Sequence, residues 1–138
     1  WEDIIPDGIS LQVLAVHIGI TINHDRTRVK YILCQLLGNA IKFTSTGSIV
    51  LGITYHLNSD RAEFFVLDTG CGIPKEKQEL AFGLFWKDNG FIPGLGLGLH
   101  VVKKMTDGMG LKIKLESKVG FGSRFSLFAD GFLKKTEE

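Results

Sequence analysis

Two glycine-rich segments constrain the fold of this chain more than any other feature. They are Asp68-Thr69-Gly70-Cys71-Gly72-Ile73-Pro74 and Gly94-Leu95-Gly96-Leu97-Gly98-Leu99. Because glycine has no Cβ, backbone N–H groups in such segments can approach a ligand closely, and phosphate is the usual ligand. A helical stretch, Leu36-Leu37-Gly38-Asn39-Ala40-Ile41-Lys42-Phe43-Thr44, precedes them. Three ordered elements, each suited to a different part of one ligand, predict a nucleotide site.

The composition suits one compact domain that has no electrostatic footprint for nucleic acid. The 138 residues are 44% hydrophobic, which is enough for a core. The net charge is +1, and the lysines are dispersed among acidic residues. We therefore expect no DNA or RNA partner.

The cysteines and the apolar segments indicate a cytoplasmic domain without direct membrane contact. Cys34 and Cys71 have neither a metal-ligand spacing nor a disulfide pattern, which fits a reducing compartment. Polar residues interrupt the uncharged stretch 8–24, so its pattern is that of a strand rather than a membrane span. The chain begins at Trp1, so we expect a piece of a larger protein, whose other parts are free to anchor it in a membrane.

The hydrophobic periodicity predicts strands that alternate with helices in a two-layer α+β sandwich. A helix capped by Asp25 is expected to run to Phe43, since apolar residues recur there at helical spacing. The expected strands are 9–16, 49–57, 62–67, 111–117 and 123–128, the further helices are 75–85 and one from the second glycine segment through Met105, the loop is 86–93, and the loose tail is 134–138.

One flank of the first predicted helix carries polar side chains suited to a polyphosphate. At ~100° per residue, Gln35, Asn39 and Lys42 fall within ~60° of one another beside the apolar face. An amide oxygen can ligate Mg²⁺, and a lysine can neutralise phosphate charge. The alternative is the ordinary solvated flank of an amphipathic helix.

Asp68 follows an apolar strand and opens the first glycine segment. Its carboxylate can accept the amino group of adenine, while Gly70 and Gly72 let the base and sugar lie against the backbone. The alternative is a strand-ending turn, because Asp and Gly are turn formers. Asp-Thr-Gly also resembles the triplet of aspartic proteases, but the single copy would require a homodimer. That interpretation leaves the other two elements unexplained.

The second glycine segment leads directly into a helix, whose N-terminus favours an anion. No Gly-Lys-Ser/Thr follows it, so it is not a P-loop, and no strand of a βαβ unit precedes it, which excludes a Rossmann fingerprint. The alternative is close helix packing through small residues.

Together these elements resemble the ATP-binding catalytic domain of sensor histidine kinases, in the superfamily shared with gyrase, Hsp90 and MutL. Residues 36–44 resemble the N box of that family, 68–72 and 94–99 its two central glycine boxes, and 120–123 its last glycine box. Phe82 and Phe85 resemble the intervening F box. The match covers residues 9–129, and it implies the Bergerat form of the α+β sandwich, with a mixed sheet and helices on one face.

The resemblance also assigns roles to residues. Asn39, together with Gln35, would ligate Mg²⁺, Lys42 would contact phosphate, and Asp68 would accept the adenine amino group. Asn39 and Lys42 are the catalytic candidates, with residues 86–93 as a lid. The residues that the resemblance assigns to nucleotide binding are Asn39, Lys42, Phe43, Asp68, Gly70, Gly72, Ile73, Gly94, Leu95, Gly96, Leu97, Gly98, Leu99 and Ser123.

The resemblance implies ATP and Mg²⁺ as cofactors, and two protein partners. These are a helical dimerisation domain that carries the phosphoacceptor histidine and a response-regulator receiver domain. None of the four histidines of this chain lies in such a helical context. Gln35 and Leu84 depart from the usual Asn and Arg, and the lid is short. These departures leave open a regulatory nucleotide-binding module without kinase activity, whereas Lys42-Phe43-Thr44 disfavours a serine kinase of the anti-sigma-factor type.

Overall fold

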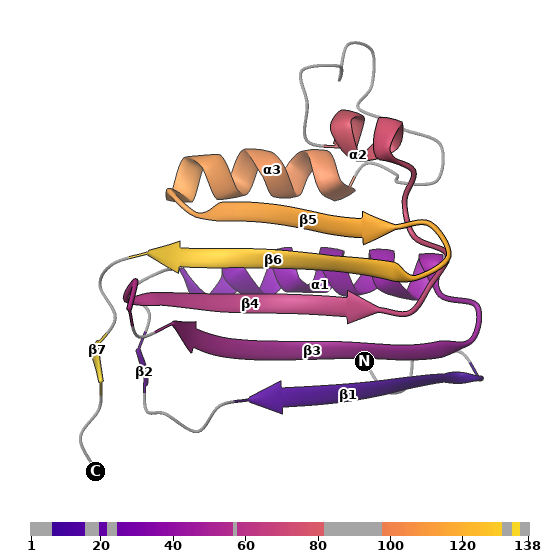
Figure 1. The fold of residues 1–138 in the computed structure, drawn as a ribbon. Helices are drawn as coiled ribbons and strands as arrows, with labels where there is room; N and C mark the ends of the chain where they lie inside the picture. The colour runs from indigo at the N-terminus through magenta and orange to yellow at the C-terminus, as the bar shows by residue number, and fades with distance from the viewer. Residues whose placement is uncertain are drawn as a thin grey trace.

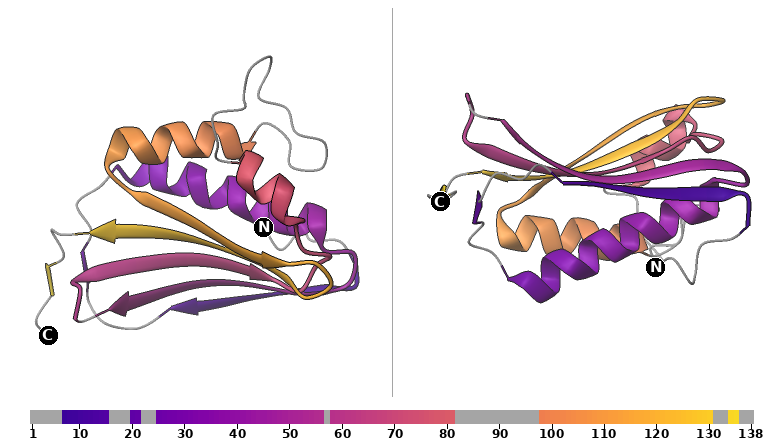
Figure 2. Two further views of the ribbon diagram at one scale, coloured as in Figure 1. Left: turned by 45° about the horizontal axis from the view of Figure 1, so that its top comes forward. Right: turned by 90° about the horizontal axis from the view of Figure 1, so that it is seen from below.

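A five-stranded sheet forms one layer of the molecule, and two helices form the other (Figures 1 and 2). The structure is a computed structural model that describes residues 7–15, 20–21, 25–56, 58–81, 98–130 and 134–135. The elements are β1 (Ile9–Ala15), β2 (Ile20–Thr21), α1 (Arg26–Phe43), β3 (Gly47–His56), β4 (Arg61–Asp68), α2 (Lys75–Ala81), α3 (Gly98–Met109), β5 (Lys112–Lys118), β6 (Gly122–Asp130) and β7 (Lys134–Lys135).

The sheet is mixed, as the sequence predicts for an α+β sandwich. Its strand order is β1-β3-β4-β6-β5, in which β1 runs parallel to β3 and the other neighbours are antiparallel. A parallel pair needs a long crossover connection, and α1 lies in the one between β1 and β3. Figure 2 shows α1 and α3 on the same face of the sheet.

The core lies between α1 and that face of the sheet. The apolar residues on the buried side of α1 are Ile32, Leu36, Leu37 and Ala40, which recur at helical spacing. Inward-facing strand residues, such as Val66 and Phe125, complete the core. Asp25 caps α1, because its carboxylate accepts hydrogen bonds from the backbone N–H of Thr27 at 2.9 Å and of Arg28 at 3.1 Å. The sequence prediction of this helix and its cap is confirmed.

Two segments differ from the sequence-based expectation. Helix α3 continues past Met105 to Met109, because Thr106 is fully buried there and Gly110, with φ of 71°, ends the helix. The interpretation of 134–138 as a loose tail is wrong for Lys134–Lys135, which pair antiparallel with Ile20–Thr21. Pairing between strands so far apart in sequence leaves no local pattern. Within the described residues, no helix has the length and apolar character needed to cross a membrane.

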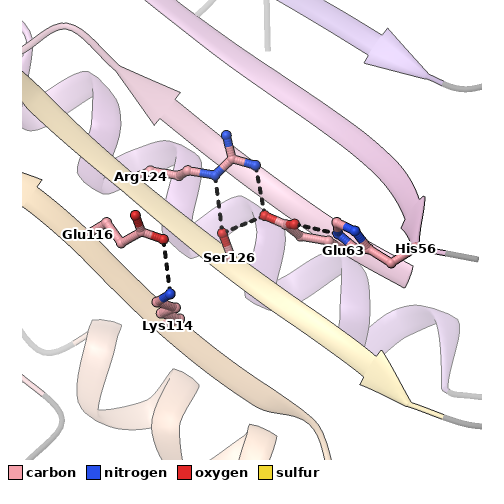
Figure 3. A network of polar contacts seen from close by, with 6 residues as sticks. All are labelled: His56, Glu63, Lys114, Glu116, Arg124 and Ser126. Carbon is pink, nitrogen blue, oxygen red and sulfur yellow. Dashed lines mark hydrogen bonds and ion pairs between the residues drawn. The ribbon is translucent and has the colours of Figure 1, made fainter. Parts of the chain in front are cut away.

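The opposite face of the sheet carries a polar network centred on Glu63 (Figure 3). The Glu63 carboxylate accepts hydrogen bonds from Arg124 and Ser126, both at 2.8 Å, and lies 2.8 Å from the His56 ring nitrogen. The Arg124 guanidinium also lies 4.1 Å from the centre of the Phe65 ring. Burial acts to raise the pKa of Glu63, but the hydrogen bonds from Arg124, His56 and Ser126 outweigh it, so the pKa lies below its ordinary value.

We expect Glu63→Gln to destabilise the domain by about 1–2 kcal/mol at pH 7, because hydrogen bonds to a charged group are worth more than neutral ones. Since folding lowers this pKa, the stability is present above the ordinary value of 4.5 and is lost as the pH falls through the lowered value. The difference in the free energy of unfolding between the parent chain and Glu63→Gln should therefore become smaller as the pH falls. Urea unfolding at several pH values measures this difference. A difference that stayed the same at every pH would contradict this account.

Glu116→Gln is the matched control for Glu63→Gln. Glu116 also faces away from the helices and pairs with Lys114 at 3.3 Å, but its side chain is 60% exposed (Figure 3). An exposed ion pair of this kind contributes a few tenths of a kcal/mol. The control therefore separates the effect of burial from the effect of removing a charge.

Candidate nucleotide-binding site

The predicted site residues that the structure describes gather at one end of the sheet. Strands β4 and β5 end there, β6 and β3 begin there, and α1 reaches it with its last turn (Figure 1). The turn after β4, residues 68–73, is called the Asp68 turn below. Its Cys71 N–H donates to the Phe43 carbonyl at 3.1 Å, which ties it to the C-terminus of α1.

Asp68 is a buried carboxylate whose two oxygens differ in their hydrogen bonding to the described residues. One oxygen, Oδ1, accepts a hydrogen bond from the Gly70 N–H at 2.9 Å. The other, Oδ2, is buried and has no hydrogen-bond partner among the described residues. Burial raises the pKa of Asp68 above its ordinary value, although the backbone N–H groups of Gly70 and Ser123 oppose the shift. A buried acceptor without a partner calls for a donor from outside the described residues.

The glycines of the Asp68 turn are required by neighbouring backbone. A Cβ on Gly70 would lie 2.2 Å from the Phe43 carbonyl oxygen, and one on Gly72 would lie 2.2 Å from the Lys118 carbonyl oxygen. The backbone of Gly72 also has φ of 78°, a value that residues with a side chain rarely adopt. The sequence predicts glycine here for access to the ligand. The structure adds a second reason, the close approach of α1 and of the β5–β6 hairpin.

The β5–β6 hairpin closes over the other side of the turn. Gly120 N–H donates to the Cys71 carbonyl at 2.9 Å, and the Ser117 hydroxyl accepts from the Ile73 N–H at 2.8 Å. Ser123, a predicted site residue, lies opposite Asp68 in the sheet, and its hydroxyl is 2.7 Å from that of Ser117. The structure thus brings the last glycine box against the first.

Sequence reasoning missed two residues at this point, Ser117 and Gln78. The Gln78 side chain of α2 donates to the Ile73 carbonyl at 2.6 Å and to the Ser117 carbonyl at 3.1 Å. One signal could have identified Ser117. It follows Ile113 and Leu115 in the inward-facing register of β5, where an apolar residue would be expected.

The polar flank of α1 reaches the site with its last two turns. Asn39 is 8% exposed, and its Nδ2 atom is buried without a hydrogen-bond partner among the described residues. Gln35 is partly buried one turn earlier, and Lys42 is exposed in the last turn. Phe43 packs partly against the core. The side-chain amides of Asn39 and Gln35 offer hard oxygen ligands that carry no charge. They therefore fit a Mg²⁺ ion for which the phosphates of a nucleotide supply most of the ligands.

Part of the predicted site lies outside the described residues. This holds for Gly94, Leu95, Gly96 and Leu97, for the F box, and for the lid at 86–93. Gly98 begins α3, and Leu99 is fully buried in the core. In Figure 1 the N-terminal end of α3 points toward the end of the sheet where the Asp68 turn lies.

Comparison with known proteins decides the family. Residues 24–131 match the family described as histidine kinase-, DNA gyrase B- and HSP90-like ATPases. The chain belongs to this family. Its membership confirms the superfamily that the glycine boxes and the N box predict, and with it the ATP-binding character of the domain.

Similar proteins include sensor proteins and histidine kinases. The chain is 35% identical over 128 residues to the virulence sensor protein BvgS of Bordetella bronchiseptica, which covers 87% of this chain and 10% of BvgS. Full-length ShkA in complex with AMPPNP superposes with a TM-score of 0.76 at 28% identity, over 95% of this chain and 27% of ShkA. The catalytic domain of histidine kinase ThkA gives a TM-score of 0.69 at 28% identity, over 89% and 78% of the two chains.

These likenesses confirm both the fold class and the assignment to the catalytic domain of sensor histidine kinases. The chain spans about a tenth of the length of BvgS.

Proposed function

We propose that this domain binds ATP with Mg²⁺ at the Asp68 turn and presents the γ-phosphate to a histidine on a separate helical dimerisation domain. The observation that supports it most is the Oδ2 atom of Asp68, a buried acceptor at the end of β4 that has no hydrogen-bond partner in the described part of the chain. The amino group of adenine is a donor that would satisfy it. A receiver domain is the proposed next acceptor of the phosphate.

In this proposal, each of the described site residues contacts a different part of the nucleotide. Asp68 accepts the adenine amino group, and Gly70, Gly72 and Ile73 form the backbone wall beside the base. Asn39 and Gln35 offer amide oxygens to Mg²⁺, which supplies positive charge to the phosphates when bound. Lys42 adds its own charge from the exposed end of α1. The chain orients the γ-phosphate and neutralises its charge, and these two effects carry catalysis of phosphoryl transfer.

The remaining boxes complete the proposal. Gly94, Gly96 and Gly98, with the leucines between and after them, are proposed to cradle the phosphates at the start of α3. The domain works in the cytoplasm, as part of a longer sensor protein. Calorimetry on the chain with ATP and Mg²⁺ tests the first step, and absence of binding would contradict it.

A transfer assay tests the second step. Mixing the chain with the helical dimerisation domain of its parent protein and γ-labelled ATP should label a histidine of that domain. Binding of ATP without transfer would favour the regulatory module without kinase activity.

We expect Asn39→Ala to weaken ATP binding about tenfold or more when Mg²⁺ is present, and far less when Mg²⁺ is chelated. The reason is that the variant removes an oxygen ligand of the metal and leaves the base contacts in place. Titration calorimetry with and without a chelator measures both values. Asn58→Ala, which changes an exposed residue between β3 and β4, is the matched control. An equal loss under both conditions would argue against a metal ligand at Asn39.

A further inference from the structure

We propose that Ser117 and Gln78 are positioning residues that hold the Asp68 turn in the shape that receives adenine. Neither residue belongs to the boxes that carry the family resemblance. The inference rests on the proposed function, because it concerns how the turn is prepared for the base. It adds two side chains, one from β5 and one from α2, that act on the base through the backbone of Ile73.

The Ser117 hydroxyl is the centre of the first set of contacts. It lies 2.8 Å from the Ile73 nitrogen, 3.0 Å from the Gly122 carbonyl oxygen and 2.7 Å from the Ser123 hydroxyl. A hydroxyl has one proton to donate and can accept two hydrogen bonds. Donation to Gly122 therefore leaves Ser117 to accept from both the Ile73 N–H and the Ser123 O–H. Every hydrogen-bonding position of this hydroxyl is then used.

Gln78 holds the other half of the same peptide segment. Its side-chain nitrogen lies 2.6 Å from the Ile73 carbonyl oxygen and 3.1 Å from the Ser117 carbonyl oxygen. The two acceptors fix the orientation of the amide, since an amide oxygen in that place would face two carbonyl oxygens. The backbone N–H and C=O of Ile73 are thus both bound, one to β5 and one to α2, and its side chain is 1% exposed.

These contacts complete the fixing of the turn, because the backbone hydrogen bonds of Cys71 to α1 and to the β5–β6 hairpin hold only its middle. Gly70 and Gly72 carry no side chains, and glycine loses more conformational freedom on ordering than any other residue. A turn that is ordered before the ligand arrives spares the ligand that entropic cost. Asp68 lies at one end of the turn and Ile73 at the other. Fixing the Ile73 peptide therefore helps to fix the place of the Asp68 carboxylate relative to the backbone beside the base.

Three variants and two matched controls test this role. Ser117→Ala removes the hydroxyl, Gln78→Glu keeps the size of the side chain but removes its two donors, and Ser117→Thr restores a hydroxyl. Ser126→Ala removes a buried hydroxyl of the same sheet that bonds to Glu63 instead. Glu76→Gln changes an exposed residue of α2. Calorimetry gives the dissociation constants of ATP with Mg²⁺ and of AMP for each protein.

We expect Ser117→Ala and Gln78→Glu each to weaken ATP binding about five- to tenfold, the effect of one or two lost hydrogen bonds. AMP should weaken by the same factor, because the turn contacts the base and not the outer phosphates. Ser117→Thr should restore most of the affinity, and the two controls should stay within about twofold of the parent chain.

Amide hydrogen exchange separates positioning from general loss of stability. In Ser117→Ala the Gly70 amide, which bonds to Asp68, should exchange about tenfold faster, while the Leu51 amide in the middle of β3 should keep its rate. Equal acceleration at both amides would overturn the positioning role. Parent-like ATP affinity in both variants would overturn it as well and leave the proposed function standing. If the parent chain itself binds no ATP, the proposed function fails first.

Discussion

Asp68→Asn is expected to weaken ATP binding by about ten- to a hundredfold and at the same time to make the unliganded domain more stable at neutral pH. The loss of affinity follows from the loss of a charged acceptor for the adenine amino group, because hydrogen bonds to charged groups are worth about 1.5–3 kcal/mol. The gain in stability follows from the removal of a charge that burial disfavours and whose Oδ2 lacks a partner among the described residues.

The pH dependence of stability gives a second readout of the same residue. Folding raises the pKa of Asp68, so its contribution to stability is fully present below the ordinary value of 3.8 and is lost as the pH rises through the raised value. The free energy of unfolding of Asp68→Asn should therefore exceed that of the parent by a growing amount as the pH rises from 3.8 through the raised pKa. The ATP affinity of the parent chain should rise with pH over the same range, because the adenine amino group prefers the ionised carboxylate. It should fall as the pH drops through the raised pKa of Asp68.

Thermal unfolding across pH and titration calorimetry measure these effects. Asp107→Asn is the matched control, because Asp107 is exposed on α3 and pairs with Lys103 one turn away. It should change neither ATP affinity nor the pH profile appreciably. A variant at Asp68 that bound ATP as tightly as the parent would remove the main support for the proposed function.

Gly72→Ala should destabilise the domain by about 3 kcal/mol or more and prevent ATP binding in the molecules that remain folded. Two effects add at this position. The backbone has φ of 78°, which costs about 1–3 kcal/mol for a residue with a side chain. The new Cβ would also lie 2.2 Å from the Lys118 carbonyl oxygen, so either the turn or the β5–β6 hairpin has to move.

Gly38→Ala is the control for this substitution. Gly38 is exposed in the middle of α1, and an added Cβ would meet nothing within 4 Å. Alanine there should stabilise the domain by about 0.5–1 kcal/mol, because glycine is a poor helix former. Urea unfolding of both variants checks the contrast. Similar stabilities for the two would mean that the Asp68 turn accommodates a side chain.

The strongly periodic elements could be predicted from the sequence. Helix α1 follows from the spacing of Ile32, Leu36 and Leu37 and from the cap at Asp25, and both signals are local. The last turn of α3 is not evident from the sequence, because Thr106, Asp107 and Gly108 are weak helix formers, and burial of Thr106 offsets their cost. The partnership of β2 with β7 could not be predicted, because its two strands are separated by most of the chain.

In the candidate site, too, some residues could be predicted from the sequence and others could not. Asn39 and Asp68 stand out in the sequence because polar groups interrupt or follow apolar runs, and the structure leaves a buried atom of each without a partner among the described residues. Gln78 has no such signal in its own neighbourhood, and Ser117 has only the alternation of β5, which leads one to expect an apolar residue at its position. Their role arises only because β5 and α2 both meet Ile73.

The sequence alone was enough to recognise the family, because the resemblance rests on short runs of residues: amides and a lysine on a helix flank, a carboxylate after an apolar strand, and glycines where the backbone approaches a ligand. The tertiary structure decided which groups are buried and which are held. It raised the pKa of Asp68 by burial, made Gly70 and Gly72 necessary through the backbone of α1 and β5, and joined Ser117 to Ile73. Burial and close approach both depend on contacts between segments that are far apart in the chain, so no local sequence pattern specifies them.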